Sequence, residues 1–179
     1  MNITDKRSLR KEIRAEIGKL SIEDKQSFSS QIFSKIVTSS ELKEASVVSI
    51  FVSLPDEPQT TTFIEQLLHE QKRVVVPRIE GDEMNFYDIS EGVEIGSFGI
   101  MEPISTTPIE PSQIEVMIVP GVAFTPSGLR CGRGKGFYDR YMSRSGFRAY
   151  TIGVCYPCQV IDELPCEEHD KKVDKVILL

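Results

Sequence analysis

The chain has 179 residues, of which 40% are hydrophobic and 27% are charged, and its formal net charge is -6. This length suits one ordinary domain, and the composition excludes disordered, collagen-like and repeat proteins. No apolar run approaches the roughly 18 residues that a membrane span needs, and the N-terminal residues are charged where a signal peptide is apolar. We therefore expect one domain over residues 1–179, a monomer that stays in the cytoplasm and away from membranes.

Three helices are predicted in the first half of the chain. Hydrophobic residues recur at spacings of four, four and three within residues 9–20, which predicts an amphipathic helix with Thr4 as its N-cap. Ser21 and Asp24 form a capping-box pattern, which predicts the start of a second helix. Residues 61–71 are typical of a third helix.

Several short apolar runs predict a buried sheet. They are residues 47–54, 73–77, 116–121, 150–155 and 176–179. Because these runs are continuously apolar, both faces of the sheet should be covered, and helices between the strands favour a three-layer α/β/α sandwich with a mainly parallel sheet. Residues 84–89 are a candidate edge strand, and residues 91–112 are predicted to be a long connection or a partly ordered flap.

Positive charge is concentrated in two segments of this acidic chain. Residues 1–19 hold six Lys or Arg against three acids, and residues 128–148 hold six against one, so the other 139 residues carry a net -14. Such a distribution suits a small polyanion better than a long one such as a nucleic acid. In an open α/β sheet ligands bind at the carboxyl ends of the strands. The segments that follow the predicted strands there are residues 55–58, 77–78, 120–124 and 156–159.

The most specific segment is PGVAFTPSGLRCGRGKGFYDRYM, residues 120–142, in which a strand end leads through a glycine-rich loop into a predicted helix. Glycine-rich turns let backbone N–H groups approach phosphate oxygens. The loop is neither a Walker A motif, because Gly follows its Lys, nor the dinucleotide fingerprint, because its glycines are spaced differently. Arg130, Arg133 and Lys135 favour a phosphate-binding loop over a flexible basic hairpin.

Two acids near this loop are candidate Mg²⁺ ligands. Asp139 lies in the first turn of the predicted helix, where a carboxylate also simply favours the helix dipole. Beside a bound phosphate it would be repelled unless a cation bridged the two, and Mg²⁺ held by one or two carboxylates and phosphate oxygens is the usual arrangement. Asp170 is a possible second carboxylate, and the alternative is a solvated acid in a charged loop.

Four segments of the sequence resemble the 5-formyltetrahydrofolate cyclo-ligase family, also called 5,10-methenyltetrahydrofolate synthetases. The segments are KRSLR (6–10), SIFVSLPDEPQT (49–60), MIVPGVAFTPSGLRCGRGKGFYDRYM (117–142) and LPCEEHDKKVD (164–174). Many members have two tyrosines where this chain has Phe137 and Tyr138. The resemblance implies an enzyme that uses ATP and Mg²⁺ to convert 5-formyltetrahydrofolate to 5,10-methenyltetrahydrofolate, with release of ADP and phosphate.

The resemblance also implies a set of site residues. It places ATP on Lys6, Arg7, Ser8, Leu9, Arg10, Arg130, Cys131, Gly132, Arg133, Gly134, Lys135, Gly136, Phe137 and Tyr138. It places the folate on Val52, Glu57, Arg133, Gly134, Lys135, Gly136 and Phe137. It implies that Asp139 and Asp170 bind Mg²⁺ and that Arg133 and Lys135 are the catalytic residues.

The residue types suit these implied roles. Lys6 and Arg10 are four apart and so share one helix face. Glu57 follows a buried strand and could accept two N–H bonds from a pterin edge, although an exposed turn acid is the alternative. The formyl oxygen would attack the γ-phosphate, N10 would close the ring and phosphate would leave. Arg133, Lys135 and loop N–H groups would neutralise the moving charge without any protein nucleophile.

Two other functions stay open from the sequence. One is a non-catalytic module that binds RNA or nucleotide through its basic, aromatic loop, and the other is a sugar-phosphate or coenzyme A enzyme on a similar scaffold. The Cys155 and Cys158 pair invites a thioredoxin-like or zinc interpretation. It follows a late strand and lacks a second pair, so we expect all four cysteines to be free thiols.

Overall fold

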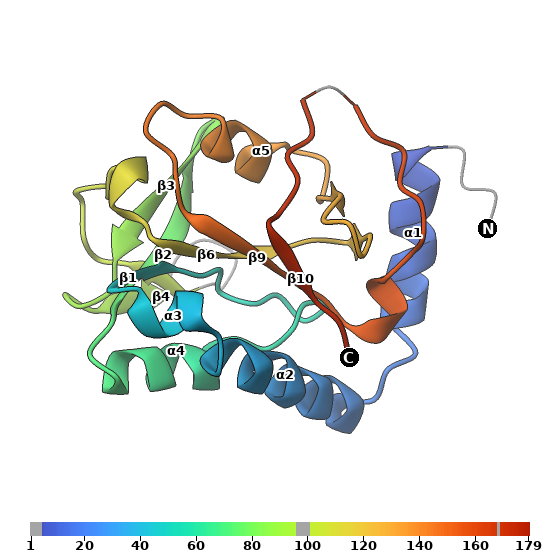
Figure 1. The fold of residues 1–179 in the computed structure, drawn as a ribbon, viewed down its shortest axis with the longest axis horizontal. Coiled ribbons are helices and arrows are strands. Elements are labelled where there is room, and N and C mark those ends of the chain that lie inside the picture. The colour runs from blue at the N-terminus through green and yellow to red at the C-terminus, as the bar shows by residue number, and fades with distance from the viewer. Residues whose placement is uncertain (1–4, 96–100, 168) are drawn as a thin grey trace.

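The structure, a computed structural model, describes residues 5–95, 101–167 and 169–179 (Figure 1). Its centre is a six-stranded sheet in the order β10-β9-β6-β1-β2-β3. These strands are β1 (Val47–Ser49), β2 (Arg73–Glu80), β3 (Glu83–Asp88), β6 (Val116–Pro120), β9 (Tyr150–Val154) and β10 (Lys175–Ile177). All neighbours pair in parallel except β2 and β3, which form an antiparallel hairpin at one edge. The predicted mainly parallel sheet is confirmed, with β3 as its edge strand.

Five α-helices and two short 3₁₀ helices accompany the sheet in the described part of the chain. They are α1 (Lys6–Ile17), α2 (Ile22–Val37), α3 (Ser40–Glu44), α4 (Thr61–His69), α5 (Phe137–Met142), η2 (Pro111–Gln113) and η3 (Pro157–Gln159). In Figure 1, α2, α3 and α4 lie on one side of the sheet and α5 on the other. The architecture is therefore the expected three-layer α/β/α sandwich.

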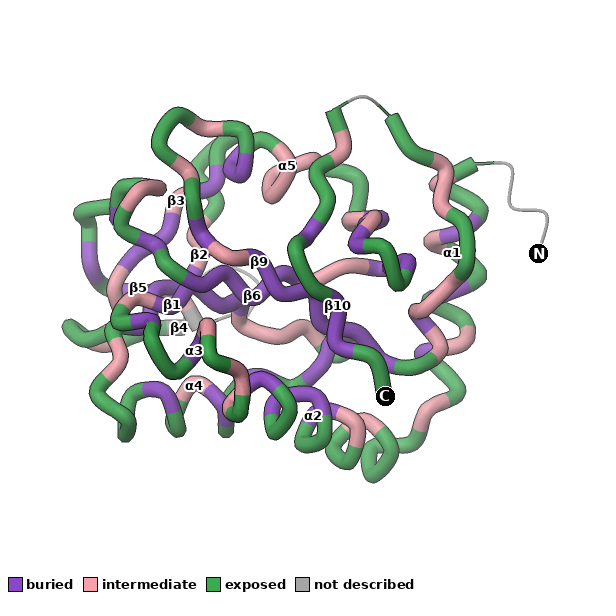
Figure 2. The backbone as a smooth tube through the Cα atoms, in the orientation of Figure 1, coloured by how far each residue is buried: buried purple, intermediate pink, exposed green. Residues whose placement is uncertain are grey.

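Two hydrophobic clusters explain why the strands are continuously apolar. Ile118 of β6 packs in a cluster with Ile32 and Phe63 of α2 and α4, whereas its neighbour Met117 packs in a cluster with Tyr141 of α5. Successive side chains of a strand point to opposite faces, so a strand covered on both sides needs apolar residues throughout. Figure 2 shows the buried residues along β1, β6 and β9.

Helix α1 lies outside these layers and packs on the loops beyond the sheet. Its predicted apolar stripe is buried, and Leu9 and Ile13 belong to a third cluster with Val122, Cys131 and Tyr156. This packing holds α1 against the loop after β6 and against η3. The basic residues of α1 are thereby brought beside the glycine-rich segment.

The helix starts follow local capping rules, with one correction. The predicted capping box of α2 is present, since Ser21 accepts from the Asp24 N–H and Asp24 accepts from the Ser21 N–H. The N-cap of α1 is Asp5, whose carboxylate accepts N–H groups from the next turn, so the assignment of the cap to Thr4 was wrong. Thr4 itself lies outside the described residues. An Asp one position nearer the helix is an equally good cap and reaches the free N–H groups.

The first predicted strand is shorter than expected. Only Val47–Ser49 form β1, and the chain then continues into a turn in which the Leu54 N–H donates to the Glu57 carboxylate at 2.9 Å. This turn lies at the carboxyl end of the sheet. Its conformation is fixed by a side chain that a hydrophobicity pattern does not show.

The segment 91–112 has more structure than the prediction gave it. It contains a small antiparallel hairpin of β4 (Val93–Ile95) and β5 (Met101–Pro103), and residues 96–100 lie outside the described part. A second unpredicted hairpin pairs β7 (Ala123–Phe124) with β8 (Arg130–Cys131). Strands of two or three residues are too short for an alternating pattern to reveal them.

All four cysteines are free, as expected. No helix in the described residues is both long enough and apolar enough to cross a lipid bilayer.

Candidate functional site

Two cavities lie side by side at the carboxyl ends of the strands. The first, which we call the apolar cavity, has a volume of about 600 Å³ and follows the ends of β1, β2 and β6. The second, the polar cavity, has a volume of about 780 Å³ and lies between α1, α5 and the segment before β10. Gly132, Lys135, Gly136 and Asp139 line both cavities. The shared wall is therefore the segment 132–136, which we call the glycine loop, and the start of α5.

The two cavities differ in the chemistry of their walls. The apolar cavity is lined by residues that include Phe51, Val52, Ile79, Met84, Phe137 and Tyr138. The polar cavity is lined by residues that include Lys6, Arg10, Arg140, Glu167, His169 and Asp170. The first suits a flat aromatic ligand, and the second suits a polyanion with a counter-ion. Of the segments predicted to surround a ligand, 156–159 does not line either cavity.

The glycine loop is held open by backbone conformations that favour glycine. Gly134 has φ +105° and Gly136 has φ +65°, and both values lie in the left-handed region. The Arg10 guanidinium donates to the Gly132 carbonyl at 2.7 Å, and a Cβ on Gly134 would lie 3.4 Å from that guanidinium. Helix α1 thus braces the loop from one side through Arg10.

Glu57 is a buried carboxylate at the edge of the apolar cavity. Its residue is only 7% exposed, which excludes the alternative of an exposed turn acid. One carboxylate oxygen accepts from the Leu54 N–H at 2.9 Å, and the other accepts from Arg133 Nε at 2.9 Å. The Tyr156 hydroxyl donates to the Glu57 carbonyl at 2.7 Å. Segment 156–159 therefore supports the site from behind through the backbone of Glu57.

Arg133 ties the glycine loop to the turn after β1. Its guanidinium also pairs with Asp56, so two carboxylates face one cation. Partial burial alone would lower the pKa of Arg133, but Asp56 and Glu57 raise it above its usual value. Glu57 and Arg133 both line the apolar cavity, so their ion pair is part of its wall.

Lys6 and Asp170 meet across the polar cavity although they are far apart in the chain. Lys6 Nζ lies 2.6 Å from Asp170 Oδ2 and 2.9 Å from Glu167 Oε1. Partial burial alone would raise the pKa of Asp170, but hydrogen bonds from Lys6 and from the Glu167 N–H lower it below its usual value. Asp170 is therefore a partly buried, fully ionised carboxylate and not a solvated loop acid.

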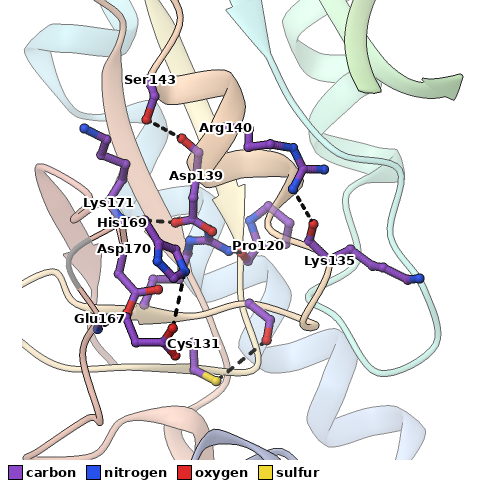
Figure 3. A network of polar contacts seen from close by, with 12 residues as sticks. Pro120, Cys131, Lys135, Asp139, Arg140, Ser143, Glu167, His169, Asp170 and Lys171 are labelled. Atoms are coloured by element: carbon purple, nitrogen blue, oxygen red, sulfur yellow. Dashed lines mark hydrogen bonds and ion pairs between the residues drawn. The ribbon is translucent and has the colours of Figure 1, made fainter. Parts of the chain in front are cut away.

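Asp139 joins the same region from α5. Its Oδ2 accepts from Arg130 Nη2 at 2.9 Å, and its Oδ1 accepts from the Lys171 N–H at 3.2 Å. Asp139 and Asp170, the two predicted metal ligands, both line the polar cavity. Figure 3 shows them together with Lys171, the residue that follows Asp170 in the chain.

The donor type of these two residues, carboxylate oxygen, is compatible with a magnesium ion. No group of three or more His, Cys, Asp or Glu side chains in the described residues could hold a metal alone. Mg²⁺ commonly takes one or two protein carboxylates and completes its shell with phosphate oxygens and water. Both oxygens of Asp139 and Oδ1 of Asp170 accept one hydrogen bond each and so keep a lone pair with which to bind a cation.

Arg130 and Tyr138 lie on the apolar side of the shared wall. The Arg130 side chain is 3% exposed and its guanidinium carbon lies 5.5 Å from the centre of the Tyr138 ring. Arg130 Nε and the Tyr138 hydroxyl are buried and have no hydrogen-bond partner among the described residues. Burial raises the pKa of Tyr138, so this hydroxyl stays protonated.

Lys135 stands between the two cavities. Its ammonium group has no carboxylate within ion-pair distance in the part of the chain that the structure describes, unlike those of Lys6 and the guanidinium groups of Arg130 and Arg133. Its backbone carbonyl accepts from Arg140 Nη1 at 2.7 Å. In Figure 3 the carbonyl points at Arg140 and the side chain extends away from it.

Comparison with known proteins decides the family. The model of the 5-formyltetrahydrofolate cyclo-ligase family matches residues 2–178. The chain belongs to the 5-formyltetrahydrofolate cyclo-ligase family. It is 31% identical to the 5-formyltetrahydrofolate cyclo-ligase of Escherichia coli K12 over 174 residues, covering 92% of this chain and 95% of the relative. It is 28% identical to the mouse protein of the same name over 187 residues, covering 96% and 92%.

Solved structures of 5,10-methenyltetrahydrofolate synthetases share the fold. The NMR structure of the Aquifex aeolicus synthetase matches with a TM-score of 0.86 at 31% identity, covering 97% of this chain and 89% of that one. The Mycoplasma pneumoniae synthetase matches with a TM-score of 0.79 at 28% identity, covering 97% and 98%. The chain is thus an enzyme of this family, built on the family's fold.

Not every residue that the family resemblance placed on ATP lies at a cavity. The side chains of Leu9 and Cys131 are completely buried in the core beneath α1, and neither residue lines a cavity. Arg7 is exposed, and the Ser8 hydroxyl donates to Asp5 at 2.8 Å. A nucleotide contact from Leu9 or Cys131 would have to come from the backbone.

Sequence reasoning missed three residues that shape the site. Asp56 pairs with Arg133, Glu167 pairs with Lys6, and Arg140 holds the carbonyl of Lys135. The adjacency of Asp56 to Glu57 was available as a signal. Their partners lie far away in the sequence or on the backbone, so only the structure shows the contacts.

Proposed function

We propose that this protein converts 5-formyltetrahydrofolate to 5,10-methenyltetrahydrofolate in a reaction that consumes ATP and requires Mg²⁺. The observation that carries the proposal is the pair of cavities that share the glycine loop as a wall. A ring system in one cavity and a triphosphate in the other would bring their reacting atoms together beside the shared glycine loop. Lys135 borders both sides.

The apolar cavity is the proposed folate site. Val52 and Phe137 offer apolar surface for the flat pterin ring, and Glu57 offers a buried carboxylate for its N–H edge. The Glu57 turn is fixed by its bonds to Leu54 and Tyr156. A fixed carboxylate selects one orientation of the ring and so directs the formyl group toward the glycine loop.

The polar cavity is the proposed ATP site. Lys6 and Arg10 approach it from α1, and the glycine loop supplies closely placed backbone groups. Asp139 and Asp170 are the proposed Mg²⁺ ligands, and the bound ion would neutralise charge on the phosphates during transfer. Lys6 and Asp170 pair with each other in the structure. Binding of ATP and Mg²⁺ would replace this pair by contacts from Lys6 to phosphate and from Asp170 to the metal ion.

The chemistry requires positioning and charge neutralisation from the protein. The formyl oxygen forms a bond to the γ-phosphorus while the bond to the β-phosphate oxygen breaks. N10 then attacks the formyl carbon, its proton is released, and the carbon–oxygen bond breaks to give inorganic phosphate. Lys135 and Arg133, the proposed catalytic residues, supply positive charge where the phosphoryl group moves.

An absorbance assay for 5,10-methenyltetrahydrofolate tests this function. Purified protein is mixed with 5-formyltetrahydrofolate, ATP and MgCl₂, and each component is omitted in turn. Product that appears only in the complete mixture, together with one ADP per product, is the expected result. Folded protein that forms no product under these conditions contradicts the proposal.

The RNA-binding alternative receives less support from the structure. Arg130 and Arg133 pair with carboxylates at the cavities and do not form an open basic surface. A binding measurement with single-stranded RNA in the same preparation separates the two functions, since that module would bind RNA in a salt-dependent way without turning over ATP.

A further inference from the structure

Arg140 makes contacts that none of the assigned roles explains. It lies in α5, outside the residues that the family resemblance places on ATP, folate or metal. Its Nη1 donates to the Lys135 carbonyl at 2.7 Å, and its Nη2 donates to the Asp82 carbonyl at 2.9 Å. Both acceptors are backbone carbonyls, so the two bonds depend on the position of the backbone and not on the side chains of Lys135 and Asp82.

The guanidinium of Arg140 joins two walls of the site. Asp82 is in the turn between β2 and β3, and this hairpin supplies Ile79 and Met84 to the apolar cavity. The guanidinium carbon also lies 5.2 Å from the centre of the Phe137 ring. Arg140 therefore connects the glycine loop to the opposite wall of the apolar cavity through one planar group.

Gly136 makes this connection possible. A Cβ at Gly136 would lie 3.0 Å from Arg140 Nη1, tighter than side chains normally pack. The missing side chain leaves room for the guanidinium to reach the Lys135 carbonyl. The same absence makes the loop intrinsically flexible, because three of its five residues are glycines.

A flexible loop needs an external anchor to hold a side chain in place. A trans peptide is planar, so fixing the Lys135 carbonyl also fixes the direction of the following N–H group. The Lys135 side chain leaves the backbone away from Arg140 (Figure 3). Arg140 thus holds the backbone of Lys135 from one side and leaves the ammonium group free on the other.

We propose that Arg140 is a positioning residue that holds Lys135 at the junction of the two cavities. Its kinetic consequence rests on the proposed function, whereas its effect on loop order does not. Displacement of a catalytic group by about 1 Å can lower a rate roughly a hundredfold, so anchoring of this kind has a large effect on turnover.

The kinetic test compares Arg140→Met with Arg140→Lys and Arg144→Met. Arg144 is the matched control, because it also links the end of α5 to the β2–β3 hairpin through Asn85 Oδ1 at 2.7 Å but does not touch the glycine loop. We expect Arg140→Met to lower kcat roughly ten- to a hundredfold with little change in KM for ATP. Arg140→Lys should recover only part of this loss, since an ammonium lacks the planar, forked arrangement of donors with which the guanidinium reaches both carbonyls. Arg144→Met should keep kcat at the wild-type value.

A double variant makes the test specific. If Arg140 acts through Lys135, adding Arg140→Met to Lys135→Ala leaves kcat where Lys135→Ala alone puts it. Multiplicative losses in the double variant overturn the proposal. A rise in KM for ATP at unchanged kcat also overturns it, because Arg140 would then be a direct nucleotide ligand. An equal loss of kcat in Arg144→Met overturns it as well.

Hydrogen–deuterium exchange on the ligand-free protein tests the anchor without the reaction. Peptides that cover residues 132–138 should exchange faster in Arg140→Met than in wild type or Arg144→Met. Unchanged exchange overturns the proposal. If wild-type protein failed the absorbance assay while Arg140→Met still loosened the loop, the proposed function would fall and the anchoring role of Arg140 would stand.

Discussion

Among the charged side chains that border both cavities, Lys135 differs from Asp139 in having no charge partner in the described part of the chain. A cation without a partner contributes little to folding but is available to a ligand. We expect Lys135→Ala to lower kcat roughly a hundredfold or more while the free energy of unfolding changes by less than about 0.5 kcal/mol. Steady-state kinetics and urea unfolding of the same preparation measure the two effects.

The control for this variant is Lys43→Ala, which removes an exposed lysine of α3 that lines neither cavity. It should leave kcat and stability near the wild-type values. Turnover at the wild-type rate in folded Lys135→Ala protein would refute the proposed role of Lys135.

Tyr141 carries a buried hydroxyl that gains nothing from hydrogen bonding. The hydroxyl has no partner among the described residues, and burial raises its pKa to about 12. We expect Tyr141→Phe to keep the ring contacts with Phe86 and Phe147 and to leave the free energy of unfolding equal or up to about 1 kcal/mol higher at neutral pH.

The pH dependence of this variant has a definite sign. A folded-state pKa above the unfolded value of about 10 means that the protonated tyrosine favours the folded protein, an effect complete below pH 10 and lost as the pH rises toward 12. The advantage of Tyr141→Phe over wild type in urea unfolding should therefore grow between pH 10 and pH 12. A constant difference across that range would contradict the assignment.

At the scale of elements, the β7–β8 hairpin and the segment before β10 are joined at one glycine. The Val173 N–H donates to the Gly128 carbonyl at 2.9 Å, Gly128 has φ +91°, and a Cβ there would lie 2.3 Å from the Val173 carbonyl oxygen. Because backbone cannot yield as a side chain can, we expect Gly128→Ala to lower the free energy of unfolding by more than about 2 kcal/mol.

Gly81 provides the matched control in the β2–β3 turn. Its φ is +63°, but nothing lies within 4 Å of an added Cβ. Gly81→Ala should therefore show only the cost of the left-handed backbone, about 1 kcal/mol. Urea unfolding of both variants measures the difference, and equal losses would show that the contact with Val173 contributes nothing.

The sequence predicted the long and strongly patterned elements, and missed those set by single side chains. The stripe Leu9, Ile13 and Ile17 and the capping box at Ser21 identify α1 and α2 because period and cap agree. Helix α3 has one buried residue, Leu42, and so shows no period. The turn after β1 is held by a hydrogen bond from the Leu54 N–H to the Glu57 carboxylate, which no local pattern reveals.

The site was predictable in composition but not in pairing. The glycine loop, its cations and the candidate carboxylates Asp139 and Asp170 are visible in the sequence, and the family resemblance adds Glu57. Lys6 and Asp170 are 164 positions apart in the chain. A single sequence gives no sign that two residues so far apart form a pair. The structure therefore adds the partners and the division into two cavities.

At the scale of the whole molecule, the two basic segments of the sequence are not two basic surfaces. Lys6 and Arg133 pair with carboxylates from other parts of the chain, and Arg130 pairs with Asp139, the one acid of its own segment. The site is thus largely neutralised by its own side chains in the absence of ligands. Binding of the proposed ligands would exchange these internal partners for phosphates and pterin groups, and we expect this exchange to link the two cavities energetically.

Arg133 is the residue through which this link should act. It occupies the Glu57 oxygen that a pterin would need, and it belongs to the loop that borders the polar cavity. A nucleotide that draws Arg133 toward its phosphates frees Glu57, so we expect a nonhydrolysable ATP analogue with Mg²⁺ to tighten 5-formyltetrahydrofolate binding roughly five- to a hundredfold. Isothermal titration calorimetry with and without the analogue measures the change.

Coupling of this kind is reciprocal and specific to one side chain. The folate must tighten binding of the ATP analogue by the same factor, because the thermodynamic cycle closes. Arg133→Met should bring both factors close to one, since Glu57 then has no internal cation to release. Lys135→Ala lies on the same loop but leaves the Arg133 pair with Glu57 in place, so it should retain the coupling. Equal folate affinity in wild type with and without the analogue would exclude Arg133 as the link and leave the cavities as independent sites.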